Sequence, residues 1–549
     1  MCQPLTPQIS PLDSPPEMSR AKSHEKMIDF YVYDFRVDEP ERAMPTLLSA
    51  TPDLSTPISS AAPAPAALML RLFERCLSFP VCAAGAFGVF VYFLIPQSVA
   101  DPDIWWHLRN AEWQLQAHAF LRQDVFSSTV CGARWINHEW LAELPFYFGW
   151  RLLGALGLFL VTVAAIELIF LGVFYLAYLK SNSRLAALAV SMIAALLSTI
   201  SFAPRTLLFG WICLVAELLV LENFRKHPGL ILLLPPLFLI WVNTHGSWMI
   251  GMVIFAVFIA CGLFRIDTGA LQNLQWLPAQ RTKLLVAAGV SVLALFANPY
   301  RWRLVAYPFD LAFRQKLNIA NVEEWRTLDF HSPRGQIVFL VLAGLFLLQV
   351  LRRRSWTLCD LHFMAIGIYS AFAYSRFLFL AALLAMPCMA TTIAGDGPQT
   401  QTKTKTNRPW ANALLLLLLI PLVARHLPSS AALERSGEDR FPLRAIAYLQ
   451  HFRPRGNVFN DFLWGGFLIW HARHIQVMID SRVDIFEYNG VFQDYLDAVQ
   501  LKNTLAILDK YQARYVIFRK DAPLIYLLEH NAEWKVDYED ATTAVLERK

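Results

Sequence analysis

Long apolar runs alternate with short polar or basic segments along most of the chain, beginning after a polar N-terminal stretch. About eleven runs are long enough to cross, or nearly cross, a hydrocarbon core of about 30 Å. They lie at about 79–95, 154–179, 185–202, 206–222, 230–243, 247–264, 284–297, 336–351, 361–375, 376–393 and 410–424. This pattern predicts a polytopic α-helical membrane protein with about 11 transmembrane helices.

The positions of Lys and Arg predict the side of the membrane on which each loop lies, because cytoplasmic loops are rich in these residues. With a cytoplasmic N-terminus, every predicted inner loop is basic: Lys180 and Arg184, Arg225 and Lys226, Arg265, Arg281 and Lys283, Arg352 to Arg354, and Lys403, Lys405 and Arg408. The same count places the loops 98–153 and 298–335 outside, together with the C-terminal region. The acidic and histidine-bearing segments gather on this outer side, where we expect the chemistry.

Changes in composition divide the chain into three parts. Residues 1–66 are rich in Pro, Ser and Thr, which predicts a disordered cytoplasmic tail. Residues 67–425 form the predicted membrane domain. Residues 426–549 alternate short β-rich runs with helical stretches, which predicts an extracytoplasmic α/β domain. In that domain, strands are expected at 457–460, 476–479, 515–518 and 534–538, and helices at 463–472, 492–511 and 523–531.

The overall composition agrees with this division. Of all residues, 56% are hydrophobic and 17% are charged, whereas a soluble domain carries about 25% charged residues. A purely soluble enzyme is therefore excluded. The net charge of +5 includes no basic block in a soluble context, so nothing indicates a nucleic-acid partner.

The densest polar cluster, Asp101-Pro102-Asp103-Ile104-Trp105-Trp106-His107-Leu108, directly follows the first apolar run. Two carboxylates two residues apart can share a divalent cation or act as general base and orienting group. Oxygen ligands favour Mg²⁺ or Mn²⁺ over zinc. A solvated loop start is the alternative for Asp101 and Asp103, and an aromatic belt at the headgroups is the alternative for the tryptophans.

Two further segments carry candidate binding residues. His138 and Glu139 precede Leu141–Trp150, an apolar stretch too short to span the membrane, which we interpret as an interfacial or re-entrant helix. Together with His107 and Asp103 they could form a metal site by residue type, but no H-E-x-x-H spacing supports zinc. Asn243 and His245 lie in a turn between two predicted spans.

Arginines on the predicted outer face are not explained by the topology: Arg205, Arg301, Arg303 and Arg376. A guanidinium at headgroup level can bind a phosphate or diphosphate bidentately. The alternative is that these side chains snorkel to lipid headgroups. Three other strings are unusual: Glu323-Glu324-Trp325, Trp464-Gly465-Gly466-Phe467 and Asp480-Ser481-Arg482-Val483-Asp484. For the last two, a structural turn is the simpler interpretation.

Taken together, these strings resemble the GT-C superfamily of integral membrane glycosyltransferases. The strings Asp-x-Asp-x-Trp-Trp-His-Leu, Asn-x-His-Gly, Asn-Pro-Tyr, Glu-Glu-Trp and Asn-Asp-x-x-Trp-Gly-Gly are similar to those of a group of bacterial multipass glycosyltransferase-like proteins. The resemblance covers about 79–545. It implies a location in the bacterial inner membrane.

In that superfamily the donor is a polyprenyl-phosphate-linked sugar, and an acidic residue of the first exported loop is general base or metal ligand. The resemblance therefore assigns this role to Asp101 or Asp103, and lipid-phosphate binding to Arg205 or Arg376. The adjacent Asp-Glu pair of protein O-mannosyltransferases and the Trp-Trp-Asp-Tyr-Gly string of oligosaccharyltransferases are absent. The acceptor, whether glycan, lipid or protein, stays open.

Two other functions remain in view. A transporter or flippase of lipid-linked or anionic substrates would need ionisable residues inside the spans, where Glu167 and Glu217 are the candidates. A non-catalytic envelope assembly protein would tolerate replacement of both aspartates by Asn.

Overall fold

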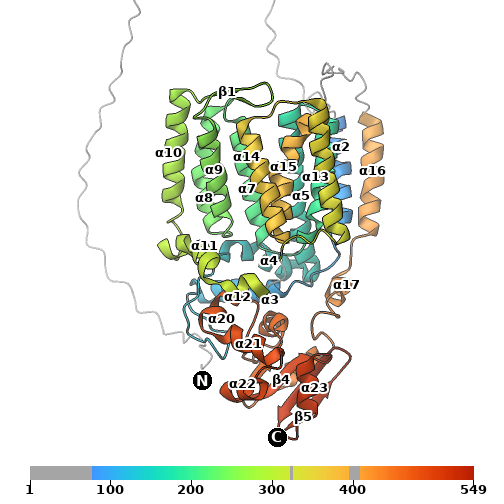
Figure 1. The fold of residues 1–549 in the computed structure, drawn as a ribbon. Coiled ribbons are helices and arrows are strands. Elements are labelled where there is room, and N and C mark those ends of the chain that lie inside the picture. Colours follow the sequence, from blue (N-terminus) through green and yellow to red (C-terminus); the bar gives the residue numbers. More distant parts are fainter. Residues whose placement is uncertain (1–76, 322–324, 395–408) are drawn as a thin grey trace, which may run out of the picture. The chain divides into compact units, whose positions relative to one another are not determined.

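The computed structural model describes residues 77–321, 325–394 and 409–549, all within one compact unit of the chain. The predicted tail 1–66 and the pair Glu323-Glu324 lie outside the described residues. Long helices run side by side in this unit, and shorter helices and a β-sheet lie beyond one set of their ends (Figure 1).

Each predicted apolar run coincides with helical structure. The helices are α2 (Phe79–Leu94), α5 (Ala155–Ser181), α6 (Arg184–Ser198) with η1 (Thr199–Ser201), α7 (Leu207–Asn223), η2 (Pro228–Leu233) with α8 (Leu234–Val242), α9 (Trp248–Cys261), α10 (Pro278–Ala294), α13 (Pro333–Arg352), α14 (Leu358–Ala373), η4 (Ser375–Phe377) with α15 (Leu378–Ala394), and α16 (Pro409–Arg425). A small hairpin, β1 (Ile266–Asp267) and β2 (Gln272–Asn273), precedes α10.

Several of these helices have the length and hydrophobicity of membrane spans. Within the described residues four qualify by themselves, namely Ala155–Ser181, Arg184–Ser201, Pro333–Arg352 and Ser375–Ala394. The chain is a polytopic helical membrane protein, while the number of eleven spans stays a prediction because the other helices are shorter or less apolar.

Helix α15 is central to the packing of the membrane helices. Every side chain from Leu378 to Ala390 is buried, because α15 packs against α5, α6, α13 and α14. A helix that is apolar on all sides belongs in such a position. Close approach also occurs between α5 and the shorter helix α4 (Trp140–Leu153), where a Cβ on Gly157 would lie 1.8 Å from the Gly149 carbonyl oxygen.

The short helices near the helix ends carry the candidate site. They are α3 (Pro102–Ala117), α4, α11 (Trp302–Arg314) and α12 (Lys316–Asn321). The predicted short helix at 141–150 is confirmed as α4. Helix α3 begins at Asp101, whose side chain accepts a hydrogen bond from the Asp103 backbone N–H, with Pro102 in the first turn. Asp101 is only 3% exposed, so the alternative of a solvated loop start is wrong.

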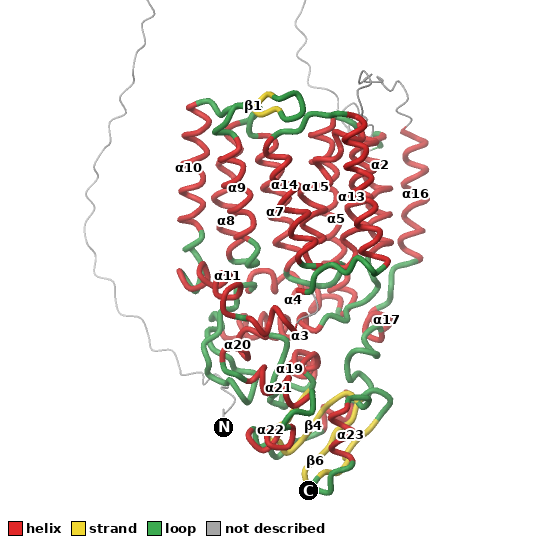
Figure 2. Tube along the Cα trace, in the orientation of Figure 1, coloured by secondary structure: helices red, strands yellow, loops and turns green. Residues whose placement is uncertain are grey.

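The C-terminal region contains a four-stranded mixed sheet (yellow in Figure 2). Its strands are β3 (Asn457–Asn460), β4 (Ala513–Arg519), β5 (Trp534–Glu539) and β6 (Thr543–Arg548), in the order β3-β4-β6-β5. Strands β3 and β4 are parallel, and β6 is antiparallel to β4 and β5. The helices are α17 (Ser430–Arg435), α18 (Ile446–His451), η5 (Phe462–Trp464) with α19 (Gly465–His471), α20 (Val483–Tyr488), α21 (Val491–Val499), α22 (Thr504–Lys510) and α23 (Pro523–Glu529). The boundaries predicted between the three parts of the chain stay predictions.

Three details of this region differ from the expectation. The strand expected at 476–479 is wrong, because only Val477 forms an isolated bridge, to Ser127 of the loop 98–153. Strand β6, which the sequence pattern did not predict, pairs with β4. The helix expected at 492–511 is interrupted between α21 and α22, where Leu501 and Asn503 adopt φ values of 60° and 53°.

Candidate functional site

The candidate site lies where α3 and α4 meet the turn between α8 and α9, α11 and the segment before α20. The sequence places these elements far apart, and the fold brings them together beyond the ends of the long helices (Figure 1). Polar side chains connect them. Three features make up the site: a pair of aspartates on α3, a glutamate surrounded by histidines, and a contribution from the C-terminal region.

Asp101 is held in an ion pair. Its Oδ2 atom accepts a hydrogen bond from Nε of Arg205 at 2.6 Å, and its Oδ1 atom accepts from the Asp103 backbone N–H at 3.0 Å. Arg205 lies just before α7, so this pair connects the start of a long helix to the start of α3. Both oxygens of Asp101 are engaged, which leaves Asp103 as the more available carboxylate.

Asp103 has the properties of a general base. Burial, followed by the negative charge of Asp101, raises the pKa of Asp103 to about 6, although Arg205 opposes the shift. The Trp106 indole N–H donates to Ser481 Oγ at 3.0 Å and lies 3.4 Å from Asp103 Oδ1. Trp105 and Trp106 are buried, so they do not form an aromatic belt. A carboxylate with a pKa near neutral suits proton abstraction.

Glu139 lies among three histidines. Its carboxylate oxygens are 3.2 Å from His245 Nε2, 3.5 Å from His107 Nε2 and 3.6 Å from His138 Nε2. Burial would raise the pKa of Glu139, but the histidines outweigh this effect and lower it to about 2. Glu139 is therefore an anionic centre that fixes the three imidazole rings.

The hydrogen bonds of His245 define its tautomer. The backbone N–H of Ser247 donates to His245 Nδ1 at 3.0 Å, so the neutral ring carries its proton on Nε2, facing Glu139. Burial, despite Glu139, lowers the pKa of His245 to about 4, and the charges of His138 and Arg376 contribute. His245 is therefore neutral near pH 7 and acts as a hydrogen-bond donor.

His107 lies between two carboxylates. Its Nδ1 atom is 3.0 Å from Glu143 Oε1, and its Nε2 atom faces Glu139. Burial opposes the charged form, but Glu143 and Glu139 together raise the pKa of His107. The ring also contacts the Trp106 ring in a tilted arrangement, with centroids 3.6 Å apart. The contact with Glu143 thus sets the orientation of the His107 ring.

Glu143 is a positioning residue that the sequence pattern did not single out. It is fully buried and accepts further hydrogen bonds from Asn137, Asn110 and Gln114 at 3.0 to 3.3 Å. The available signal was a lone acid inside an apolar helix, one turn after Glu139.

Replacing Glu143 with Gln is expected to lower the pKa of His107, because the buried negative charge beside Nδ1 is lost. The measurement is a pH titration of ¹³C-labelled histidine side chains by NMR, with the His107 signal assigned from the His107→Gln variant. The exposed Glu434→Gln variant serves as a control. An unchanged His107 titration in the Glu143 variant would contradict this arrangement.

The three remaining candidates, Arg376, Asn243 and Arg301, lie in different surroundings. Arg376 lies in η4 with its guanidinium 4.4 Å from the Trp325 ring, and its charge reaches His245. Asn243 has a structural role, because its Oδ1 atom accepts from the Trp140 indole and its amide donates to two backbone carbonyls. The guanidinium of Arg301 is exposed and forms no hydrogen bond or ion pair with any other described residue, so it does not join the cluster.

The C-terminal region contributes Ser481 and Asp484, which belong to the string that we interpreted as a turn. Asp484 Oδ2 accepts a hydrogen bond from Tyr307 at 3.1 Å, and the Tyr307 ring lies 4.6 Å from the His138 ring. Gly466 permits this docking, since a Cβ there would lie 2.8 Å from the Pro102 carbonyl oxygen at the start of α3.

Few donor atoms of the site are free to bind a metal ion. No group of three or more His, Cys, Asp or Glu side chains is placed to hold a metal in the described ranges. Both Asp101 oxygens are engaged, and the His245 Nε2 atom bears the proton in the neutral ring. The Mg²⁺ or Mn²⁺ expected at Asp101 and Asp103 stays a prediction.

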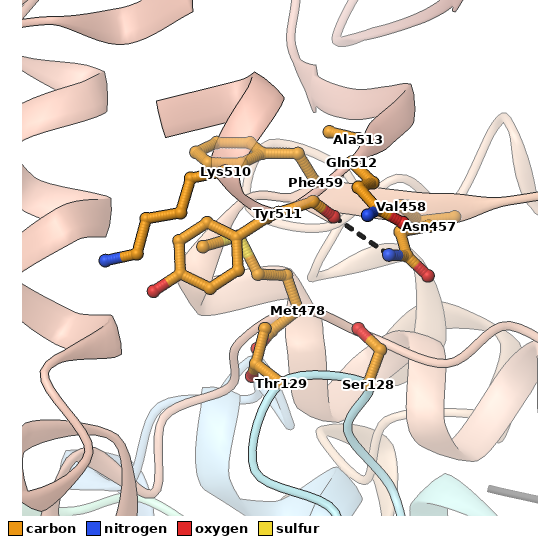
Figure 3. Close-up of a pocket in the computed structure, with 10 residues that line it drawn as sticks. All are labelled: Ser128, Thr129, Asn457, Val458, Phe459, Met478, Lys510, Tyr511, Gln512 and Ala513. Atoms are coloured by element: carbon orange, nitrogen blue, oxygen red, sulfur yellow. Dashed lines mark hydrogen bonds between the residues drawn. The ribbon is translucent and has the colours of Figure 1, made fainter. Parts of the chain in front are cut away.

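A separate cavity of about 220 Å³ lies at the amino ends of β3 and β4 (Figure 3). Its lining includes Ser128, Met478 and Tyr511, and the Asn457 amide donates to the Tyr511 carbonyl at 2.8 Å across one side. None of the aspartates or histidines of the candidate site lines it, so it lies apart from that site, between the C-terminal region and the loop 98–153.

Solved structures share this fold at low sequence identity. The oligosaccharyltransferase of Archaeoglobus fulgidus tethered to an acceptor peptide aligns with a TM-score of 0.51 at 11% identity, over 80% of this chain and 69% of that chain. Its apo form aligns with a TM-score of 0.50 at 11% identity, over 79% and 68%. ArnT from Cupriavidus metallidurans bound to undecaprenyl phosphate aligns with a TM-score of 0.48 at 12% identity, over 87% and 97%.

No protein-family model matches the sequence, and the comparison with curated proteins gives no match. The narrower bacterial group inferred from the sequence strings therefore stays a prediction. The structural similarity shows that this chain shares the fold of the archaeal oligosaccharyltransferase structures.

Proposed function

We propose that this chain is a membrane glycosyltransferase that moves a sugar from a polyprenyl-phosphate donor to an acceptor hydroxyl. The observation that carries the proposal is Asp103, a half-buried carboxylate with a pKa raised to about 6 beside the Asp101–Arg205 ion pair. The reaction would take place on the extracytoplasmic face of a bacterial inner membrane. The basic inner loops and the GT-C fold support this orientation and reaction class.

In the proposed reaction, Asp103 removes the proton of the acceptor hydroxyl as its oxygen attacks the anomeric carbon. The bond from that carbon to the phosphate oxygen breaks, and the lipid phosphate leaves with the electron pair, so the configuration inverts. Because lipid phosphate is a good leaving group, the enzyme mainly positions the reactants and stabilises charge.

Other side chains have distinct proposed roles. Arg376, with its planar guanidinium held over Trp325, is suited to bind the donor phosphate. Arg205 orients Asp101 and thereby the start of α3. The side chains of His138 and His245 are 23% and 15% exposed, so their partly accessible rings can contact polar groups of a substrate.

One observation favours a second candidate function. Glu217 on α7 is fully buried, and neither of its carboxyl oxygens has a hydrogen-bond partner among the described residues. An ionisable residue inside a membrane helix is costly and marks transport pathways in many proteins. A transporter or flippase of a lipid-linked or anionic substrate is therefore the alternative.

Glycan profiling of a deletion strain tests the proposal. Wild type and the exposed control Asp521→Asn are expected to restore a glycan product, whereas Asp103→Asn is expected to abolish it and Asp101→Asn and Arg376→Ala to reduce it. All variants are compared at equal membrane levels. If both aspartate variants restore the glycan product to the level seen with wild type, the catalytic proposal is wrong, and transport or assembly is favoured.

A further inference from the structure

Helix α11 has two faces of opposite character. Trp302, Phe309 and Phe313 are 63%, 50% and 76% exposed. With 3.6 residues per turn, these three side chains fall within about 40° of one another around the helix axis. Leu304 and Tyr307 on the other face are buried. The exposed aromatic stripe has no partner within the described part of the chain that removes it from solvent.

The position of α11 indicates what covers this stripe. The helix follows α10 after a short turn and crosses the end of α10 rather than continuing it (Figure 1). It therefore lies at the level where the long apolar helices end. In a polytopic membrane protein this level is the boundary between acyl chains and headgroups, where exposed aromatic side chains are favourable.

The charges around the stripe match a negatively charged surface. Arg301 and Arg303 are exposed at the start of α11, and Arg314 is exposed at its end. Only Arg314 has an acidic partner on the helix, Asp310, at 3.4 Å. Cationic side chains beside an apolar helix face bind anionic lipid surfaces.

We propose that α11 docks on the anionic lipid bilayer, with Trp302, Phe309 and Phe313 among the acyl chains and Arg301 and Arg303 at the lipid phosphates. The contact is independent of glycosyl transfer, so it does not rest on the proposed function. It accounts for Arg301, which the fold leaves outside the candidate site.

Lipid docking of α11 has a consequence for the candidate site. Tyr307, on the buried face, donates to Asp484 and packs its ring against His138. The bilayer surface would therefore hold α11 and, through Tyr307, one wall of the site. Lipid contact and site geometry are coupled through a single helix only 13 residues long.

Photocrosslinking of the full chain tests this proposal. The photoreactive residue p-benzoylphenylalanine replaces Phe309 or Phe313, and for the control it replaces Tyr526, which is 67% exposed on α23. The proteins are reconstituted in vesicles of phosphatidylcholine and phosphatidylglycerol, illuminated, and analysed by mass spectrometry. We expect at least tenfold more acyl-chain adducts at positions 309 and 313 than at 526.

Equal adduct yields at 313 and 526, or adducts formed mainly with protein, would overturn the proposal. Undecaprenyl phosphate is also added to the vesicles as a minor component. Preferential adducts with this lipid would overturn the proposal as well, since the stripe would then bind the isoprenoid chain.

The double variant Arg301→Gln/Arg303→Gln tests the contribution of the charges. It is expected to lower adduct yield at 313 severalfold in the anionic vesicles and leave it unchanged in pure phosphatidylcholine, whereas no loss in anionic vesicles would contradict the assigned role of the arginines.

Discussion

Replacing Arg482 with Met is expected to destabilise the protein strongly. The Arg482 guanidinium is buried and pairs with Asp124 at 2.7 Å and with Asp480 at 2.6 Å. It also lies over the ring of Trp135 at 4.8 Å. Removal of the cation leaves two buried carboxylates without their counter-ion, which costs about 3–5 kcal/mol.

The expected result is a lower midpoint of thermal unfolding for the purified full chain in detergent. Arg519→Met is the matched control, since Arg519 forms an exposed pair with Asp521 at 3.3 Å, and surface substitutions change stability by about 0.5 kcal/mol or less. Adding Asp124→Asn and Asp480→Asn to the Arg482 variant should restore part of the loss. Equal midpoints for the Arg482 and Arg519 variants would show that Arg482, Asp124 and Asp480 do not hold the C-terminal region on the loop 98–153.

The second large effect is expected for Asp103→Asn on the rate of sugar transfer. Loss of a general base costs about 10²–10⁴-fold in rate. Since burial and Asp101 raise the pKa of Asp103 to about 6, the wild-type carboxylate becomes protonated below this pH. The wild-type rate should therefore rise with pH through about 6 and then level off.

Transfer rates measured on isolated membranes between pH 4.5 and 8 would reveal this profile. Asp521→Asn is the control, because its carboxylate is exposed and remote from the site; its profile should match wild type. A residual rate in Asp103→Asn that is independent of pH around 6 is part of the expectation. A wild-type rate independent of pH in this range, or a fully active Asp103 variant, would assign the base elsewhere.

The long helices were predictable because a hydrocarbon environment requires continuous apolar runs whose backbone groups bond within the helix. The same reasoning predicted α4, whose apolar run is too short to span. By contrast, the strand expected at 476–479 does not form, since Val477 pairs instead with Ser127. A short run of residues with high β propensity does not determine which segment it pairs with, because strand pairing depends on the tertiary structure.

The residue types of the candidate site could be predicted from the sequence, but the contacts among these side chains could not. His107, His138, Glu139 and His245 were identified as polar groups at one level of the membrane, and the fold brings all four together. Their arrangement depends on contacts across more than a hundred residues, which no local pattern encodes.

The distinction between the two aspartates likewise required the fold. Asp101 pairs with Arg205, which engages its carboxylate. The Trp106 indole beside Asp103 donates mainly to Ser481, which leaves the Asp103 carboxylate more available. Glu143 was missed because an isolated acid within an apolar segment resembles an ordinary interfacial residue. Substrate binding by Arg301 stays a prediction, because a guanidinium at headgroup level can serve lipid and substrate phosphates equally well.

The fate of a labelled sugar on its lipid carrier tests glycosyl transfer by this chain most directly. Membranes of the deletion strain, carrying radiolabelled polyprenyl-phosphate-linked sugar, are fused with vesicles containing purified wild type or Asp103→Asn. We expect wild type to move label from the lipid fraction to an acceptor fraction in equal amount, and the variant to leave it on the lipid. Label that stays on the lipid with wild type as with the variant would contradict glycosyl transfer, because transport alone leaves the bond between sugar and phosphate intact.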